Sequence, residues 1–70
     1  MQIQSSNIKS AEYDRENRIL TMVFINRPRW VYHYYNVPSS IWVRFIRATS
    51  KGVFFAHHIK DVYLFKRKVI

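Results

Sequence analysis

The side chains of this chain that could do chemistry are concentrated in one aromatic segment and the basic segment after it. The stretch WVYHYYNVP, residues 30–38, carries rings at five of its first six positions, and Arg44 and Arg47 follow. Tyrosines beside arginines are the side chains that stack on bases and neutralise phosphates in single-stranded nucleic-acid sites. A small domain also uses such rings to build its core. The segment therefore leaves two uses open, a binding platform and a core.

A metal site has little support in the sequence. His57 and Asp61 are four residues apart and could share one face of a helix, but two ligands make a weak site and no third is evident. The chain has no cysteine, which excludes disulfides and thiolate ligands. We expect no metal.

The carboxylates offer little for acid–base catalysis. Glu12, Asp14 and Glu16 alternate along the chain into a polar turn, and only Asp61 lies beyond them. Such a row is typical of a solubilising strand edge rather than of a positioned acid and base. We therefore expect neither an enzyme nor a cofactor.

Alternating hydrophobicity predicts three strands, at residues 8–14, 18–25 and 29–36, joined by polar turns at 15–18 and 26–29. Strands joined by turns this short are typical of an antiparallel meander.

The two-residue period of a strand also divides the aromatic segment into two sets. Tyr32 and Tyr34 fall on one face, where they can line a core together with Leu20 and Met22. Burial is the preferred interpretation for these tyrosines. The outward face then presents Val31, His33 and Tyr35 to a ligand.

After Pro38 the period becomes helical. Pro suits a first helical turn, and Ser39 or Ser40 can cap it. The main helix runs through SSIWVRFIRAT and packs on the sheet, and Gly52 is expected to end it.

A short second helix is expected at 53–60, with VYLF at 62–65 as the candidate for a final short strand and 66–70 as a basic tail. The predicted fold class is α+β.

The net charge of +8 is unevenly distributed. Residues 1–16 carry a net charge of −1, and residues 17–70 carry ten Lys and Arg against one Asp. A basic surface attracts polyanions. No stretch is long and apolar enough to span a membrane, and the N-terminus lacks the apolar core of a signal peptide. We expect a cytoplasmic protein whose partner is nucleic acid or an acidic protein.

An ordered set of short motifs resembles the KTSC domain, a bacterial and phage domain also found at the C-terminus of some lysyl-tRNA synthetases. The matching residues are SSNIKSAEYD (5–14), RILTMVF (18–24), VYHYYNVP (31–38), SKG (50–52), Phe54-Phe55, Ile59-Lys60 and Tyr63. The resemblance implies one KTSC-like domain over 1–70, with a core at about 5–65. It carries over no catalytic residue, and the link to a tRNA-handling enzyme favours RNA over DNA. The chain departs from the family pattern at 26–29, where Asn-Arg-Pro-Arg adds charge to a turn, and at Ala56, where Asn is common.

These observations predict a small non-enzymatic nucleic-acid-binding module. Arginines and lysines of the helix face and loops would contact phosphates, and His33 or Tyr35 would stack on bases. The candidate binding residues are Arg29, His33, Tyr35, Arg44, Arg47, Lys51 and Lys60. The alternative is a protein-interaction adaptor or a phage or prophage accessory protein.

Overall fold

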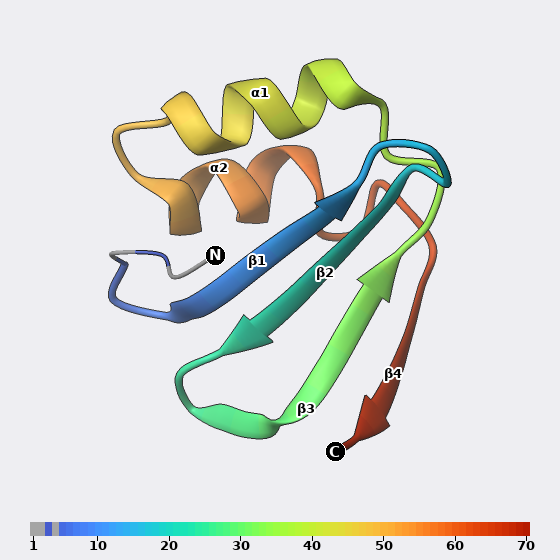
Figure 1. Ribbon diagram of the computed structural model, residues 1–70. Coiled ribbons are helices and arrows are strands. Elements are labelled where there is room, and N and C mark those ends of the chain that lie inside the picture. The colour runs from blue at the N-terminus through green and yellow to red at the C-terminus, as the bar shows by residue number, and fades with distance from the viewer. Residues whose placement is uncertain (1–2, 4) are drawn as a thin grey trace.

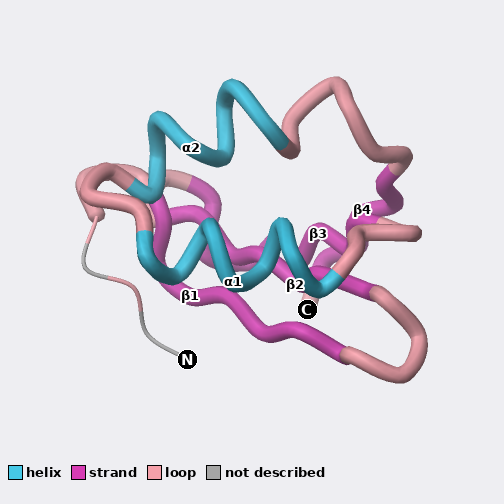
Figure 2. Tube along the Cα trace, turned by 90° about the horizontal axis from the view of Figure 1, so that it is seen from above, coloured by secondary structure: helices cyan, strands magenta, loops and turns pink. Residues whose placement is uncertain are grey.

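The fold is a four-stranded antiparallel sheet with two helices on one of its faces (Figure 1). The computed structural model describes residues 3 and 5–70. Its elements are β1 (Ile8–Asp14), β2 (Ile19–Phe24), β3 (Arg27–Tyr34), α1 (Ser39–Arg47), α2 (Lys51–His58) and β4 (Phe65–Val69). The strands lie in the order β1-β2-β3-β4, and both helices lie on the same side of the sheet (Figure 2). The expected α+β class and the three-stranded meander are confirmed, and the chain adds a fourth strand to them.

The final strand lies later than the sequence pattern indicated. It begins at Phe65 instead of occupying 62–65, and it takes in most of the segment expected to be a basic tail. The pairing of β4 with β3 runs without interruption from Tyr34 opposite Phe65 to Trp30 opposite Val69. This segment pairs because the outer edge of β3 offers backbone groups that would otherwise face water without a strand partner.

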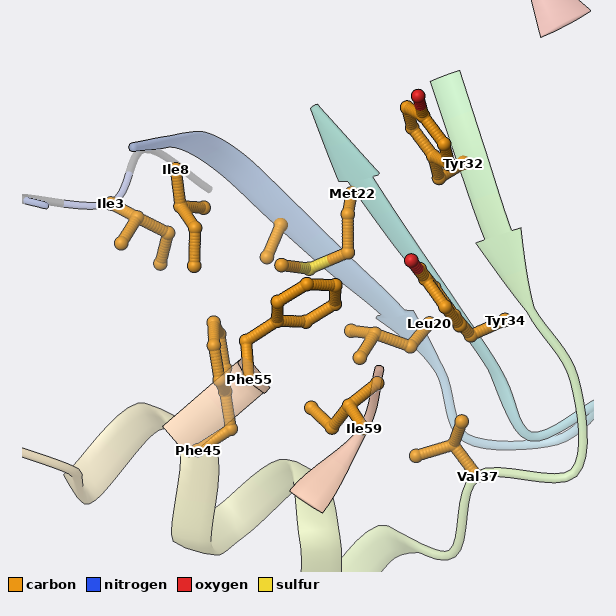
Figure 3. Packing of buried hydrophobic residues seen from close by; sticks show 11 residues of the cluster. Ile3, Ile8, Leu20, Met22, Tyr32, Tyr34, Val37, Phe45, Phe55 and Ile59 are labelled. Atoms are coloured by element: carbon orange, nitrogen blue, oxygen red, sulfur yellow. The ribbon is translucent and has the colours of Figure 1, made fainter. Parts of the chain in front are cut away.

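Both tyrosines of the aromatic segment are buried. Tyr32 is 8% exposed and Tyr34 is 3% exposed. They stand beside Met22 and Leu20, their cross-strand partners on β2 (Figure 3). The structure therefore confirms the interpretation of these rings as core residues.

The helices complete the core over the first three strands. Phe55 of α2 packs its ring 5.5 Å from that of Tyr34, and Trp42 of α1 stacks on Tyr13 of β1 at 5.5 Å. Phe45 of α1 is fully buried beneath them. A chain of this length buries a limited share of its surface, so it depends on a few large rings.

Hydrogen bonds tie the connection between β3 and α1 to the first hairpin. The hydroxyl of Tyr13 donates to the carbonyl oxygen of Val37 at 2.6 Å, and the Val37 amide donates to the carbonyl of Arg18 at 3.0 Å. Val37 itself is fully buried.

The capping predictions were wrong in detail. Pro38 is the N-cap of α1 and no side chain bonds that end, because Ser39 and Ser40 already lie within the helix. The N-cap serine is Ser50, whose hydroxyl accepts from the Val53 amide at 3.3 Å at the start of α2.

The prediction that Gly52 ends α1 was wrong. Gly52 lies in the first turn of α2, and its φ is not positive. A Cβ there would lie 2.5 Å from the side-chain oxygen of Asn7, so the glycine allows close packing.

Replacing Ser50 with Ala is expected to lower the free energy of unfolding by about 1 kcal/mol, because α2 loses the side-chain cap on the Val53 amide. Urea unfolding followed by circular dichroism measures this change. Ser40→Ala is the matched control, since Ser40 caps nothing and Ala is the better helix former. A loss as large in Ser40→Ala as in Ser50→Ala would contradict the assignment of the caps.

The Tyr34 hydroxyl is expected to make stability fall in alkaline solution. Burial, together with the nearby Tyr32 and Asp61, raises the pKa of Tyr34 from 10.0 to about 12. Below pH 10 both folded and unfolded chains hold the proton. Between pH 10 and 12 the unfolded chain releases it first, so the free energy of unfolding decreases, by about 1–2 kcal/mol.

Urea titrations at pH 8 and at successive values up to 12 measure this loss. Tyr34→Phe removes the titrating group, so the difference between wild type and variant isolates it from the titration of the lysines. Identical pH dependence in the two proteins would contradict the prediction. Tyr35→Phe serves as control, because it removes a hydroxyl outside the core.

Candidate nucleic-acid interface on the open face of the sheet

The face of the sheet opposite the helices gathers cations and rings from β3 and β4. Val31 pairs with Lys68 and His33 with Lys66. Cross-strand partners point to the same side of a sheet, and alternate residues of a strand share a face. We call this surface the open face. On β2, β3 and β4 it consists of Ile19, Thr21, Val23, Arg29, Val31, His33, Lys66 and Lys68, and Tyr35 extends it just beyond β3.

The ends of this surface are set by backbone pairing beyond the strands. The Tyr35 amide donates to the carbonyl of Leu64 at 2.9 Å, and the Ile70 amide donates to that of Arg29 at 2.8 Å. The alternation therefore continues in both directions. Tyr35 follows His33 at one end, beside Leu64, which is 83% exposed. Arg29 extends the row of cations at the other end.

The His33 ring is held in place by its neighbour on β2. Nδ1 lies 2.9 Å from the hydroxyl oxygen of Thr21, its cross-strand partner. The ring is half-buried, as are Val31 and Tyr35. Such a ring keeps its orientation on a rigid strand, which lowers the entropy lost when a flat ligand stacks on it.

The charge of the open face changes sign across the sheet. Glu12 pairs with Thr21 and Asp14 with Ile19, so both carboxylates stand on the same face at the β1 edge. Hydrogen bonds from Asn17, first from its side chain and then from its backbone, lower the pKa of Asp14, so this carboxylate stays charged. A polyanion is thereby directed away from β1, toward β3 and β4.

The predicted binding residues divide between two sides of the molecule. Arg29, His33 and Tyr35 lie together on β3 and its extension. Arg44 and Arg47 are exposed on α1, across the sheet from them, and the Arg44 guanidinium lies 5.3 Å from the centre of the Phe54 ring.

The two predicted lysines differ in their surroundings. The ammonium of Lys51 donates a hydrogen bond to the Ala48 carbonyl at 3.2 Å and so caps the end of α1. Lys60 is exposed just after α2. One bound nucleotide could not reach both the helix layer and the open face.

Lys66 and Lys68 are not among the predicted binding residues, because residues 66–70 have the composition of a basic tail. The signal was the alternation in FKRKV, where Phe65, Arg67 and Val69 occupy one set of positions and the two lysines the other. Basic residues in a short terminal segment hide the strand period, since every position of β4 is exposed.

Within residues 3 and 5–70, no three His, Asp or Glu side chains lie close enough together to hold a metal ion. None of the helices in that part of the chain has the length and apolar character needed to cross a membrane.

Comparison with known proteins agrees with the motif resemblance. The KTSC domain family model matches residues 4–63. The crystal structure of a KTSC domain protein from Yersinia pestis is 37% identical in sequence, with a TM-score of 0.85, and the match covers 100% of this chain and 93% of that one. None of the curated proteins matches. The chain therefore belongs to the KTSC domain family.

Proposed function

We propose that this domain is a non-enzymatic module that binds single-stranded nucleic acid, RNA in preference to DNA, on the open face of its sheet. The observation that carries the proposal is the pairing of β4 with β3, which places Lys66 opposite His33 and Lys68 opposite Val31. The pairing makes one strip of cations and rings from two segments that are far apart in the sequence.

The spacing within the strip suits an extended strand of nucleic acid. Lys66 and Lys68 are two residues apart on one strand, so their Cα atoms are separated by about 6.6 Å. That separation is comparable with the distance between successive phosphates of an extended chain. Tyr35 and His33 then lie beside the backbone path, where bases can stack on them.

The chemistry of this face favours binding over catalysis. His33 is the one imidazole among the residues of this face, and Glu12 and Asp14 stand two strands away from it, on β1. Such a spacing favours a binding surface over a positioned acid–base pair. The preference for RNA, and with it a cytoplasmic location, rests on the link between KTSC domains and a tRNA-handling enzyme.

Binding is expected to be strongly salt-dependent. Three phosphate contacts, from Arg29, Lys66 and Lys68, predict a slope of about −2 in log K against log salt, which is about a 20-fold loss of affinity between about 50 and 200 mM salt. Lys66→Gln with Lys68→Gln leaves one contact and predicts a slope of about −0.7. Filter binding of oligo(U) and of oligo(dT) at several salt concentrations measures both slopes.

Two further double variants test whether the position of the two charges matters or only their number. Lys9→Gln with Arg15→Gln removes the same two charges near β1 and is expected to keep the wild-type slope. Arg44→Gln with Arg47→Gln tests the helix face that the sequence favoured. A slope reduced equally in all three variants would show non-specific attraction, and no retention of oligo(U) at low salt would overturn the proposal.

A protein partner is the second candidate, and the edge of β4 favours it. β4 has β3 on one side and no strand of the described chain on the other, and all its residues are exposed. An acidic peptide could add a strand to this edge, with its carboxylates facing Lys66, Arg67 and Lys68. Affinity capture from lysate, with and without nuclease, decides between the two. A partner that is retained only without nuclease supports nucleic-acid binding, and one that persists supports the adaptor.

A further inference from the structure

A groove lies on the helix side of the sheet, on the opposite face from the proposed nucleic-acid surface. It is bounded by β3, by β4, by α2 and by the residues that follow α2, and its volume is about 470 Å³. Volumes of this size are typical of small-molecule sites. The groove exists because β4 extends the sheet beyond the part that the helices cover (Figure 1).

Aromatic rings form the floor of the groove. Phe65 of β4 lies 5.2 Å from the Tyr34 ring and 5.7 Å from the Tyr32 ring, at angles of 35° and 41°. Phe55 closes the inner side, 5.5 Å from Tyr34. Phe65 is 47% exposed although its neighbours are buried. An exposed ring set on a rigid aromatic floor is a surface on which a flat ligand can stack.

Two hydroxyl groups at this floor lack partners within the described part of the chain. Neither Tyr32 nor Tyr34 hydrogen-bonds there, whereas the Tyr13 hydroxyl bonds Val37. Neither oxygen is sealed from solvent, and both residues line the groove. Buried tyrosine hydroxyls normally find a partner, so two open ones are available to a bound molecule. The Tyr34 hydroxyl, whose pKa burial raises to about 12, is protonated at neutral pH and can donate a hydrogen bond.

The rim of the groove carries more positive than negative charge. Arg27, Lys60 and Arg67 stand against the single carboxylate of Asp61. The Arg67 guanidinium lies 4.9 Å from the centre of the Trp30 ring, which stands beside the groove and outside its lining. Three cations and one anion suit a ligand that bears two negative charges, the charge of a phosphate monoester.

We propose that this groove binds a small molecule in which a flat heteroaromatic ring is joined to a phosphate, a ligand of the size of a nucleoside monophosphate. The ring stacks on Phe65 and receives a hydrogen bond from the hydroxyl of Tyr32 or Tyr34. The phosphate is held by Arg67 and Arg27. This site is distinct from the open face, because Arg67 and Lys66 are neighbours on β4 that point to opposite sides of the sheet.

Adenosine 5′-monophosphate is the probe, and two fragments of it are the controls. In calorimetric titrations near 50 mM salt, the monophosphate is expected to bind at least tenfold more tightly than either adenosine or ribose 5-phosphate. The comparison requires both parts of the ligand, the ring and the phosphate. Equal binding of the monophosphate and ribose 5-phosphate would show simple phosphate attraction, and no binding of the monophosphate at millimolar concentration would overturn the proposal.

Variants locate the site. Arg67→Gln is expected to weaken binding of the monophosphate at least fivefold, and Tyr34→Phe to weaken it by a smaller factor while keeping the ring. Lys9→Gln, which removes one charge on β1 outside the residues that line the groove, is expected to leave binding unchanged. Circular dichroism and thermal unfolding confirm that each variant is folded. The same loss in Lys9→Gln as in Arg67→Gln would contradict the site.

The fluorescence of Trp30 provides an independent measurement, through the contact of this ring with Arg67. In a Trp42→Phe protein Trp30 is the single tryptophan, and it lies against Arg67. When the phosphate engages Arg67, the emission of Trp30 is expected to change and to saturate at the concentration found by calorimetry. If calorimetry detects binding but the emission of Trp30 does not change, the ligand binds elsewhere and the proposal is overturned. Neither measurement uses RNA, so the two proposals are tested separately. The groove can fail to bind the monophosphate while the open face binds RNA, and the open face can fail to bind RNA while the groove binds the monophosphate.

Discussion

The pairing of β4 with β3 is the interaction on which the two proposed binding surfaces depend. Without it, FKRKV would be a mobile basic tail, and the sheet would end at an unpaired β3. With it, five exposed residues take fixed directions. Lys66 and Lys68 join His33 on the open face, while Phe65 and Arg67 join Tyr32 and Tyr34 at the groove. One strand thus serves both sides of the sheet because its side chains alternate.

The strand gains its position because the aromatic core lies directly beneath β3. Tyr32 and Tyr34 make β3 rigid through contacts with Phe24, Phe55 and Phe65, with ring centres 5.2 to 5.7 Å apart. Aromatic pairs at such distances stabilise beyond the area that they bury. Phe65 belongs to β4, so the same cluster that forms the core also holds the last strand in register.

Much of this fold could be predicted from local pattern. Alternation along β2 and β3 identified the buried face, with Leu20 and Met22 opposite Tyr34 and Tyr32, because a strand that is half buried keeps a period of two. The second helix was found within two residues of its bounds. Local pattern could not predict the pairing between segments that are far apart in the chain. The position of β4 depends on the free edge of β3, which is formed far away in the chain.

Local signals also misled where tertiary contacts decided the outcome. Gly52 looked like a helix terminator, but its small size serves a contact with Asn7 from before β1. For the candidate site, His33 and Tyr35 could be assigned to the outward face of β3 by alternation alone. Lys66 and Lys68 could not be assigned to this face from the sequence, because only the register of β4 against β3 places them beside His33 and Val31. The groove had no sequence signal, since Arg27 of β3 and Arg67 of β4, which both line it, are far apart in the chain.

Aromatic side-chain NMR spectra recorded during an oligo(U) titration decide whether nucleic acid binds on the open face. Ring signals report which face of the sheet the nucleic acid touches. Binding on the open face predicts shifts at His33 and Tyr35 that grow as salt is lowered, with the rings of Trp42 and Phe54 in the helix layer unchanged. Shifts confined to Trp42 and Phe54, with His33 and Tyr35 unmoved, would contradict it.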